Sequence, residues 1–213
     1  MKTTITICTC FVLLLSPAVV MAADGPYISG NIGASWLTNA DFDGKVPGIS
    51  ISSEVEFDTG LHVGAAVGYD FGEFRVEGEF GYQSHEFTEM TDLELNGIPQ
   101  GDRDADGDID AFIFLVNGFY DIDTGTKLTP YLGGGIGFAH LEIKDLFVQG
   151  IVRGDDDDTV FAYQLAGGMA YEITDQIVAD LSYRFMATSE PDFIGLEDYN
   201  SHNLVAAIRF SFR

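Results

Sequence analysis

The sequence contains two cysteines, Cys8 and Cys10, and both lie within the first ten residues. Without cysteine in the rest of the chain, a disulfide-stapled secreted scaffold is excluded. Basic residues are also scarce, with 10 Lys and Arg against 34 Asp and Glu, and the formal net charge is −24. A chain this acidic cannot neutralise phosphates, so nucleic-acid binding is excluded. Beyond the N-terminal segment, no apolar run reaches the length of about 18 residues that a membrane-spanning helix requires.

Residues 1–22 have the features of a secretory signal peptide. Lys2 supplies a short positive region, residues 5–15 form an apolar run, and Ala22 ends a stretch of small or modest residues, as at a cleavage site. The apolar run is too short to cross a membrane as a helix. A buried first helix is the alternative, which the position at the extreme N-terminus disfavours. We predict cleavage after Ala22 and a single domain over residues 23–213.

Glycine and aromatic residues are abundant, with 25 glycines and 13% aromatics. This mixture is typical of twisted strands rather than helices. Apolar and polar residues alternate with period two in segments long enough to cross a bilayer as tilted strands of about 9–11 residues. The predicted strands are Tyr27–Leu37, Thr59–Asp70, Glu73–Phe87, Ile109–Asp121, Leu128–Ile143, Thr159–Glu172, Gln176–Ala187 and Ser201–Phe212.

The connections between these segments alternate between short and long. The short ones are Phe71-Gly72, residues 122–127 and residues 173–175, and the long ones are Thr38–Asp58, Thr88–Asp108, Lys144–Asp158 and Thr188–Asn200. Such alternation is typical of a barrel in an outer membrane, with short turns in the periplasm and long loops outside. A soluble lipocalin-type barrel is the alternative, but its hairpins would not be expected to alternate so regularly. The sequence therefore predicts an all-β fold, an eight-stranded antiparallel up-and-down transmembrane β-barrel.

Charged residues share one face of the predicted strands. In the third strand, Phe74, Val76, Phe80 and Tyr82 alternate with Arg75, Glu77, Glu79 and Gln83. Because an arginine facing lipid at mid-membrane costs about 2–4 kcal/mol, the charged face is predicted to point into the barrel. The predicted interior polar network consists of Arg75, Glu77, Glu79, Asn117, Gln164, Asp180, Arg184 and Arg209. We interpret it as a structural plug, since eight strands leave just enough room for side chains. A gated or selective pore is the alternative.

The last predicted strand alternates up to the end of the chain. Leu204, Ala206, Ile208, Phe210 and Phe212 fall on one face. An aromatic-rich final strand resembles the insertion signal of bacterial outer-membrane barrels. That signal usually ends on the aromatic residue itself, whereas Arg213 follows here.

Several segments resemble the outer-membrane β-barrel family. They are residues 25–35 (GPYISGNIGAS), 64–72 (GAAVGYDFG), 117–121 (NGFYD), 129–139 (TPYLGGGIGFA), 163–168 (YQLAGG) and 181–185 (LSYRF). This family includes opacity-type proteins, rickettsial-type major surface antigens and the transmembrane domain of outer membrane protein A. The resemblance covers essentially the whole mature chain and implies a location in a bacterial outer membrane. It also implies a role as a surface antigen, an adhesin or a small porin.

About two thirds of the acidic residues fall in the long connections, which predicts a rim of negative potential that gathers cations and repels anionic polymers. A merely solvated, repulsive surface is the alternative, and it suffices for Asp155–Asp158. We expect a monomer that contacts outer-membrane lipid and binds host or cell-surface ligands through its loops. The predicted function is that of a surface structural or interaction protein, with a small-solute porin as the alternative.

One long connection carries carboxylates at alternate positions. They are Asp102, Asp104, Asp106, Asp108 and Asp110. With Gly107 for the sharp turn, they match the first nine positions of an EF-hand calcium loop. The twelfth position, normally a bidentate glutamate, is Ile113, so a full EF-hand is excluded. The segment is either an abbreviated loop that binds Ca²⁺ or an acidic loop that binds nothing specifically. No other cofactor is expected.

Enzymatic activity is not indicated. Some small outer-membrane barrels are lipid A deacylases, acyltransferases or proteases, which need a Ser/His or Asp/His constellation near one rim. His62, His85, His140 and His202 are scattered without a nearby partner pattern. Ser201 precedes His202, but neighbouring side chains on a strand point to opposite faces. We therefore predict that the protein is not an enzyme.

Overall fold

The computed structural model describes residues 25–38, 40–46, 49–95, 98–99, 103–148, 151–152, 156–189 and 199–212. Side chains are described over residues 25–38, 58–86, 108–142, 157–189 and 199–212. The predicted signal peptide and its cleavage site lie outside these residues. No helix in the described part of the chain is long and apolar enough to span a membrane.

Eight long strands pair in sequence and close on themselves. They are β1 (Gly25–Leu37), β4 (Gly60–Asp70), β5 (Phe74–Leu95), β7 (Arg103–Asp121), β8 (Leu128–Val148), β10 (Asp156–Glu172), β11 (Ile177–Thr188) and β12 (Asn200–Ser211). Every neighbouring pair is antiparallel, and β1 pairs with β12 to complete the ring. Closure leaves no edge with unpaired backbone groups, as a lipid environment demands. The prediction of an eight-stranded antiparallel barrel is confirmed.

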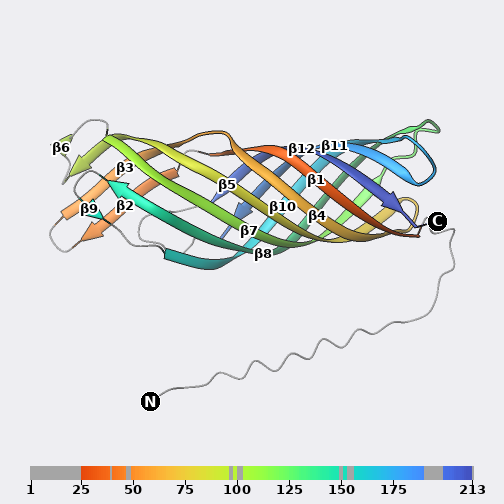
Figure 1. The fold of residues 1–213 in the computed structure, drawn as a ribbon, viewed down its shortest axis with the longest axis horizontal. Helices are drawn as coiled ribbons and strands as arrows, with labels where there is room; N and C mark the ends of the chain where they lie inside the picture. Colours follow the sequence, from red (N-terminus) through yellow and green to blue (C-terminus); the bar gives the residue numbers. More distant parts are fainter. Residues whose placement is uncertain are drawn as a thin grey trace, which may run out of the picture.

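The two ends of the barrel differ, as Figure 1 shows. One end, which we call the short-turn end, holds the three short connections and the C-terminus. There Gly72 and Gly125 adopt φ values of 95° and 67°, a left-handed conformation that glycine tolerates. The other end, the hairpin end, carries β2 (Ala40–Val46), β3 (Ile49–Phe57), β6 (Ile98–Pro99) and β9 (Ile151–Val152).

Three of the four long connections were wrongly predicted as loops without strands, namely residues 38–58, 88–108 and 144–158. β5 continues to Leu95 and β7 begins at Arg103, while β2 and β3 form a hairpin that pairs with β5. β8 likewise continues to Val148, and β10 begins at Asp156. Beyond the membrane both faces of a strand can meet water, so the alternation of apolar and polar residues that marks a strand in the sequence weakens. The connection between β11 and β12 lies within one residue of its predicted bounds, since β11 ends at Thr188 and β12 begins at Asn200.

Within the spanning region the two faces separate by polarity. Large apolar side chains such as Val67, Leu132 and Leu165 are more than 60% exposed on the outer surface. The alternate residues point inward and are buried. Near the hairpin end the lumen is partly apolar, where inward side chains of β7, β8, β10 and β11 pack together with the residue that precedes β12. This cluster consists of Ile109, Ala111, Ile113, Leu115, Ala139, Leu141, Val160, Ala162, Met186 and Tyr199.

Candidate functional site

The centre of the lumen holds a hydrogen-bond network around the carboxylate of Glu79, on β5. Its Oε1 accepts hydrogen bonds from Asn31 Nδ2 (3.1 Å) and Arg184 NH1 (2.5 Å). Its Oε2 accepts hydrogen bonds from Asn117 Nδ2 (2.7 Å) and Gln164 Nε2 (3.3 Å). Four donors match the capacity of an ionised carboxylate. Because β11, which carries Arg184, lies opposite β5 in the ring, the network crosses the whole lumen.

An ion pair fills the lumen nearer the short-turn end. Arg75 Nε and NH2 donate to the two carboxylate oxygens of Asp121 at 2.6 and 3.0 Å. The Arg75 guanidinium also lies 4.8 Å from the ring centre of Phe119 and 4.9 Å from that of Tyr131. Bidentate pairing and contact with aromatic faces both suit arginine better than lysine. The pair therefore fixes the guanidinium in one orientation across the lumen.

A second set of contacts lies beside this ion pair. Tyr27 donates a hydrogen bond to Glu77 at 2.8 Å, and Tyr131 donates one to Asp180. Arg209 NH2 lies 3.5 Å from Oδ2 of Asp180. Among the described buried side-chain atoms, only Nε of Arg209 lacks a hydrogen-bond partner. The lumen is thus packed with polar groups that satisfy one another almost completely.

A polar cavity of about 350 Å³ opens at the short-turn end. Its lining includes Asp70, Glu73, Asp121, Glu172 and Arg209. Two of these, Asp121 and Arg209, also belong to the interior ion pairs. The cavity is therefore a vestibule bounded on its inner side by the packed polar groups.

Amide and imidazole groups continue the network toward the hairpin end. Nε2 of His62 lies 3.0 Å from Oδ1 of Asn31, and Nδ2 of the same asparagine donates to Glu79. Nε2 of Gln83 lies 3.2 Å from Nδ1 of His62 and donates to Oδ1 of Asn203 at 3.1 Å. These contacts link the central carboxylate to the last strand, β12.

Tyr199 covers the network at the hairpin end. It is 1% exposed, and its ring packs in the apolar cluster of the lumen. Its hydroxyl donates to Oε1 of Gln83 at 3.0 Å, and its ring lies edge-on to His85, whose Nε2 is 3.0 Å from Ser35 Oγ. Burial raises the pKa of the Tyr199 phenol far above its usual value, and the charge of Asp110 acts in the same direction. The hydroxyl therefore keeps the proton that it donates.

The structure buries all the residues predicted for the interior network, each at most 8% exposed. It also brings in partners that we did not predict, chiefly Asp121, Tyr27 and Tyr131. Asp121 could have been found, because it alternates with Asn117 on the same strand. Tyr199 could not, because it lies outside the periodic segments and only the folded chain places it over the lumen.

Each of the four histidines contacts a polar side chain, although the sequence around them shows no catalytic partner pattern. In the lumen, His85 contacts Ser35. On the outer surface, Nδ1 of His140 lies 2.9 Å from Thr159 Oγ1 and Nε2 lies 3.5 Å from Glu142 Oε1. An acyl-transfer site also needs free N–H donors for an oxyanion, whereas pairing of β8 with β10 occupies the backbone at these residues. The contacts of His140 therefore amount to hydrogen bonding on the outer surface.

The acidic segment predicted to bind calcium is extended rather than turned. β7 begins at Arg103, and Gly107 pairs with Phe87 of β5 instead of forming a sharp turn. Asp102 and the side chains of residues 103–107 lie outside the description. The described side chains contain no cluster of three or more His, Asp or Glu residues that could hold a metal ion. Calcium binding by Asp102–Asp110 stays a prediction, which loop proteolysis with calcium and with chelator would check.

The fold and its lumen define an eight-stranded transmembrane β-barrel. A family model described as outer membrane protein beta-barrel domain matches residues 6–212, so the chain belongs to this family. Over 221 aligned residues the chain is 28% identical to outer membrane protein PagN of Salmonella typhimurium, covering 87% of this chain and 84% of PagN. A Rickettsia prowazekii protein described as a candidate adhesin, RP828, is 26% identical over 45% of this chain and 48% of its own length.

Solved structures agree with the fold. The crystal structure of Neisserial surface protein A superposes with a TM-score of 0.57 at 17% sequence identity, covering 89% of this chain and 99% of that one. Family membership locates the protein in the outer membrane, as predicted. The short-turn end accordingly faces the periplasm and the hairpin end faces outside.

Proposed function

We propose that the protein is a non-conducting, non-enzymatic barrel that acts at the cell surface as an adhesin-type interaction protein. The observation that carries the proposal is the network around Glu79. Its donors reach the centre of the lumen from β1, β7, β10 and β11. Because these side chains are buried and bonded to one another, a solute could pass only by breaking charge-assisted hydrogen bonds.

Two further layers support a closed lumen. The Arg75–Asp121 pair lies on the periplasmic side of Glu79, and Tyr199 covers the outer side. In a barrel closed by three such layers, the outer surface and the external hairpins are the parts that other molecules can contact. The protein therefore acts through contacts made outside the lumen.

An adhesin-type role is supported by one relative and by the external strands. RP828, which is similar to about half of this chain, is described as a candidate adhesin. The strands β5, β7 and β8 continue well past the spanning region, so they offer a raised surface to a partner. The acidity predicted for this end favours partners with exposed basic groups.

Planar-bilayer recording tests the closed lumen. We expect the purified wild-type protein to give no discrete, stable channels. The double variant Glu79→Ala/Tyr199→Ala removes the carboxylate at the centre of the network and the ring that covers it. If this variant conducts, it shows that insertion and recording work. Reproducible wild-type channels whose conductance changes in Arg75→Met would instead identify a small-solute porin.

Adhesion is tested separately with the protein displayed on otherwise non-adherent bacteria. The hairpin-deletion variant replaces residues 40–57, the β2–β3 hairpin, by a short Gly-Ser turn and leaves the eight barrel strands intact. We expect wild-type display to raise attachment to host-type cells and the hairpin-deletion variant to lose part of that gain. Equal attachment with and without the protein would refute the adhesin-type role without affecting the closed lumen.

A further inference from the structure

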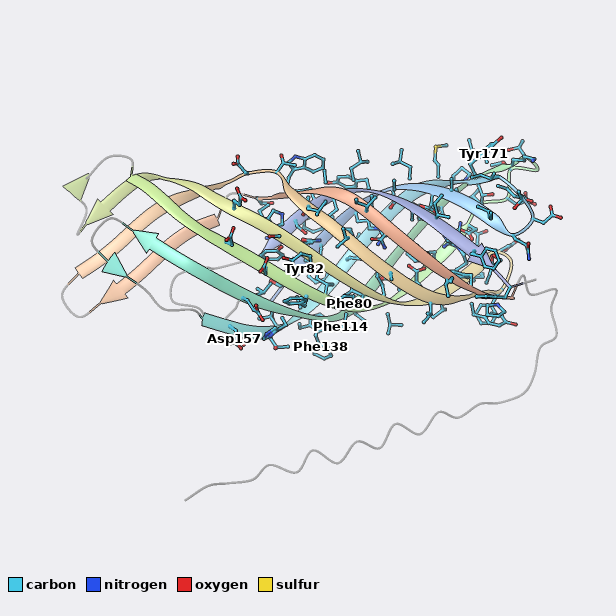
Figure 2. The ribbon with its side chains drawn as sticks, viewed as in Figure 1. Phe80, Tyr82, Phe114, Phe138, Asp157 and Tyr171 are labelled. Carbon is cyan, nitrogen blue, oxygen red and sulfur yellow. The ribbon has the colours of Figure 1, made fainter. Side chains whose placement is uncertain are left out.

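The cavity at the short-turn end collects acidic side chains from the whole circumference of the barrel. Two carboxylates come from each of the three short connections and the strand ends beside them. They are Asp70 and Glu73, Asp121 and Asp123, and Glu172 and Asp175. Figure 2 shows Tyr171, the neighbour of Glu172 on β10, at this end of the barrel. The cavity volume of about 350 Å³ lies within the range of small-ligand sites.

Half of these carboxylates already have partners. Asp121 pairs with Arg75, and Asp70 and Asp123 accept hydrogen bonds from backbone N–H groups of their own turns. The carboxylates that form no hydrogen bond or ion pair with any described residue are those of Glu73, Glu172 and Asp175. Nowhere in the described part of the chain do three acidic or histidine side chains come together in a way that could hold a metal ion. The three carboxylates therefore suit amino groups on a flexible chain better than a single metal ion.

Arg209, on β12, is the basic residue in the lining and the most weakly paired of the three interior arginines. Arg75 and Arg184 donate to carboxylates at 2.6 and 2.5 Å. NH2 of Arg209 lies 3.5 Å from Oδ2 of Asp180, and its Nε has no hydrogen-bond partner among the described atoms. The residue is nevertheless only 8% exposed. Because a buried donor without an acceptor costs free energy, this guanidinium favours a ligand that brings a carboxylate to the inner wall of the cavity.

Together, the arginine and the carboxylates select a ligand that carries both signs of charge. A purely anionic ligand would be repelled by the acidic side chains around the opening. A simple diamine would leave Arg209 as it is. A molecule with a carboxylate at one end and an amino group at the other end of a flexible chain satisfies both parts of the lining, and lysine has this chemistry.

We propose that the cavity is a periplasmic binding site for a lysine-type ligand, either the free diamino acid or a peptide that ends in one. The guanidinium of Arg209 binds the carboxylate at the inner wall, and Glu73, Glu172 and Asp175 bind the amino groups nearer the opening. The packed lumen separates this cavity from the external hairpins. The site is therefore independent of the proposed surface function.

Nuclear magnetic resonance titration of the isotope-labelled full barrel in detergent micelles tests the proposal. The probes are L-lysine, the tripeptide Ala-Ala-Lys and cadaverine, which has the two terminal amines without the carboxylate. We expect the first two to shift the backbone signals of Gly72 and Ser211, in the cavity lining, in a saturable manner. Cadaverine should bind at least about tenfold more weakly, because it cannot accept hydrogen bonds from the guanidinium. Tighter binding of lysine would identify the free amino acid as the ligand, and tighter binding of the tripeptide a peptide terminus.

Matched variants test the acidic side of the cavity. Glu172→Gln and Asp175→Asn should each weaken lysine binding by up to about fivefold. Glu142→Gln makes the same change in charge on the outer surface near the hairpin end, and it should bind lysine as the wild type does. The carboxylate contact is tested through the ligand, because replacing Arg209 would also change the packed lumen. The absence of a saturable shift with lysine and with the tripeptide, or equal affinity for lysine and cadaverine, would overturn the proposal. An effect of Glu142→Gln as large as that of Glu172→Gln would also overturn it.

Discussion

Replacing Glu79 by glutamine is the sharpest test of the packed lumen. The change keeps the shape of the side chain but removes its charge, and one of its oxygens becomes an NH₂ group. Arg184, 2.5 Å away, then lies buried without an ionised partner. At the same time, Asn117 or Asn31 meets a donor where it previously met an acceptor.

The expected loss of stability follows from these contacts. Removing one partner of a buried ion pair typically costs about 3–5 kcal/mol, because the remaining charge stays desolvated. We therefore expect Glu79→Gln to lower the free energy of unfolding by about 3–5 kcal/mol. Adding Arg184→Gln removes the orphaned charge, so we expect the double variant to be about 2 kcal/mol more stable than Glu79→Gln alone, a coupling typical of residues in one network.

The assay is reversible urea unfolding of the folded barrel in lipid vesicles. Trp36, the only tryptophan of the chain, reports on unfolding because it lies 40% exposed on the outer surface of β1. Glu73→Gln is the control, since that exposed glutamate lies at a periplasmic turn and its change should cost less than about 0.5 kcal/mol. A cost below about 1 kcal/mol for Glu79→Gln would refute the reasoning that the ion pair is desolvated.

Other predictions probe the remaining layers. Tyr199→Phe should destabilise the barrel by about 1 kcal/mol in the same assay, the value of one buried hydrogen bond; an unchanged midpoint would mean that the hydroxyl is solvated. Leu165→Arg, at a fully lipid-facing position, should cost about 2–4 kcal/mol and slow assembly in vesicles, which a gel-shift assay of folding would measure. Gly135→Ala should destabilise the barrel because the new methyl group meets Asn117 inside the lumen, whereas Gly118→Ala should be close to neutral; similar unfolding midpoints for the two would contradict the packing described.

The sequence predicts the barrel well because the membrane imposes a simple rule on each strand. Every second residue from Phe74 to Tyr82 meets lipid, so the pattern remains visible without any knowledge of partners. The rule lapses outside the bilayer, which is why residues 88–95 were predicted as a loop although they belong to β5. There the strand is specified by pairing with β3 and β7, and pairing is not visible in a single segment.

The sequence predicts which residues lie in the candidate site, but not which of them contact one another. Alternation places Arg75, Glu79 and Arg184 in the lumen. It does not say that Glu79 meets Arg184 across the ring, since that contact depends on strand tilt and register around the whole barrel. Nor does it reveal that β7 is apolar on both faces near the hairpin end, where Ile113 and Phe114 point in opposite directions.

The length of the long strands determines how the external hairpins resist a pulling force. β5 has 22 residues, whereas β11 has 12, and about 9–11 residues suffice to cross the bilayer. At about 3.3 Å per residue β5 extends for about 70 Å, and it pairs with β7 along most of that length with a register shift between Phe87 and Glu89. Antiparallel ladder bonds run perpendicular to the strands, so a pull on the outer tip directed along β5 loads many of them together. A cell attached through this hairpin would therefore be held by the shear strength of the barrel wall itself.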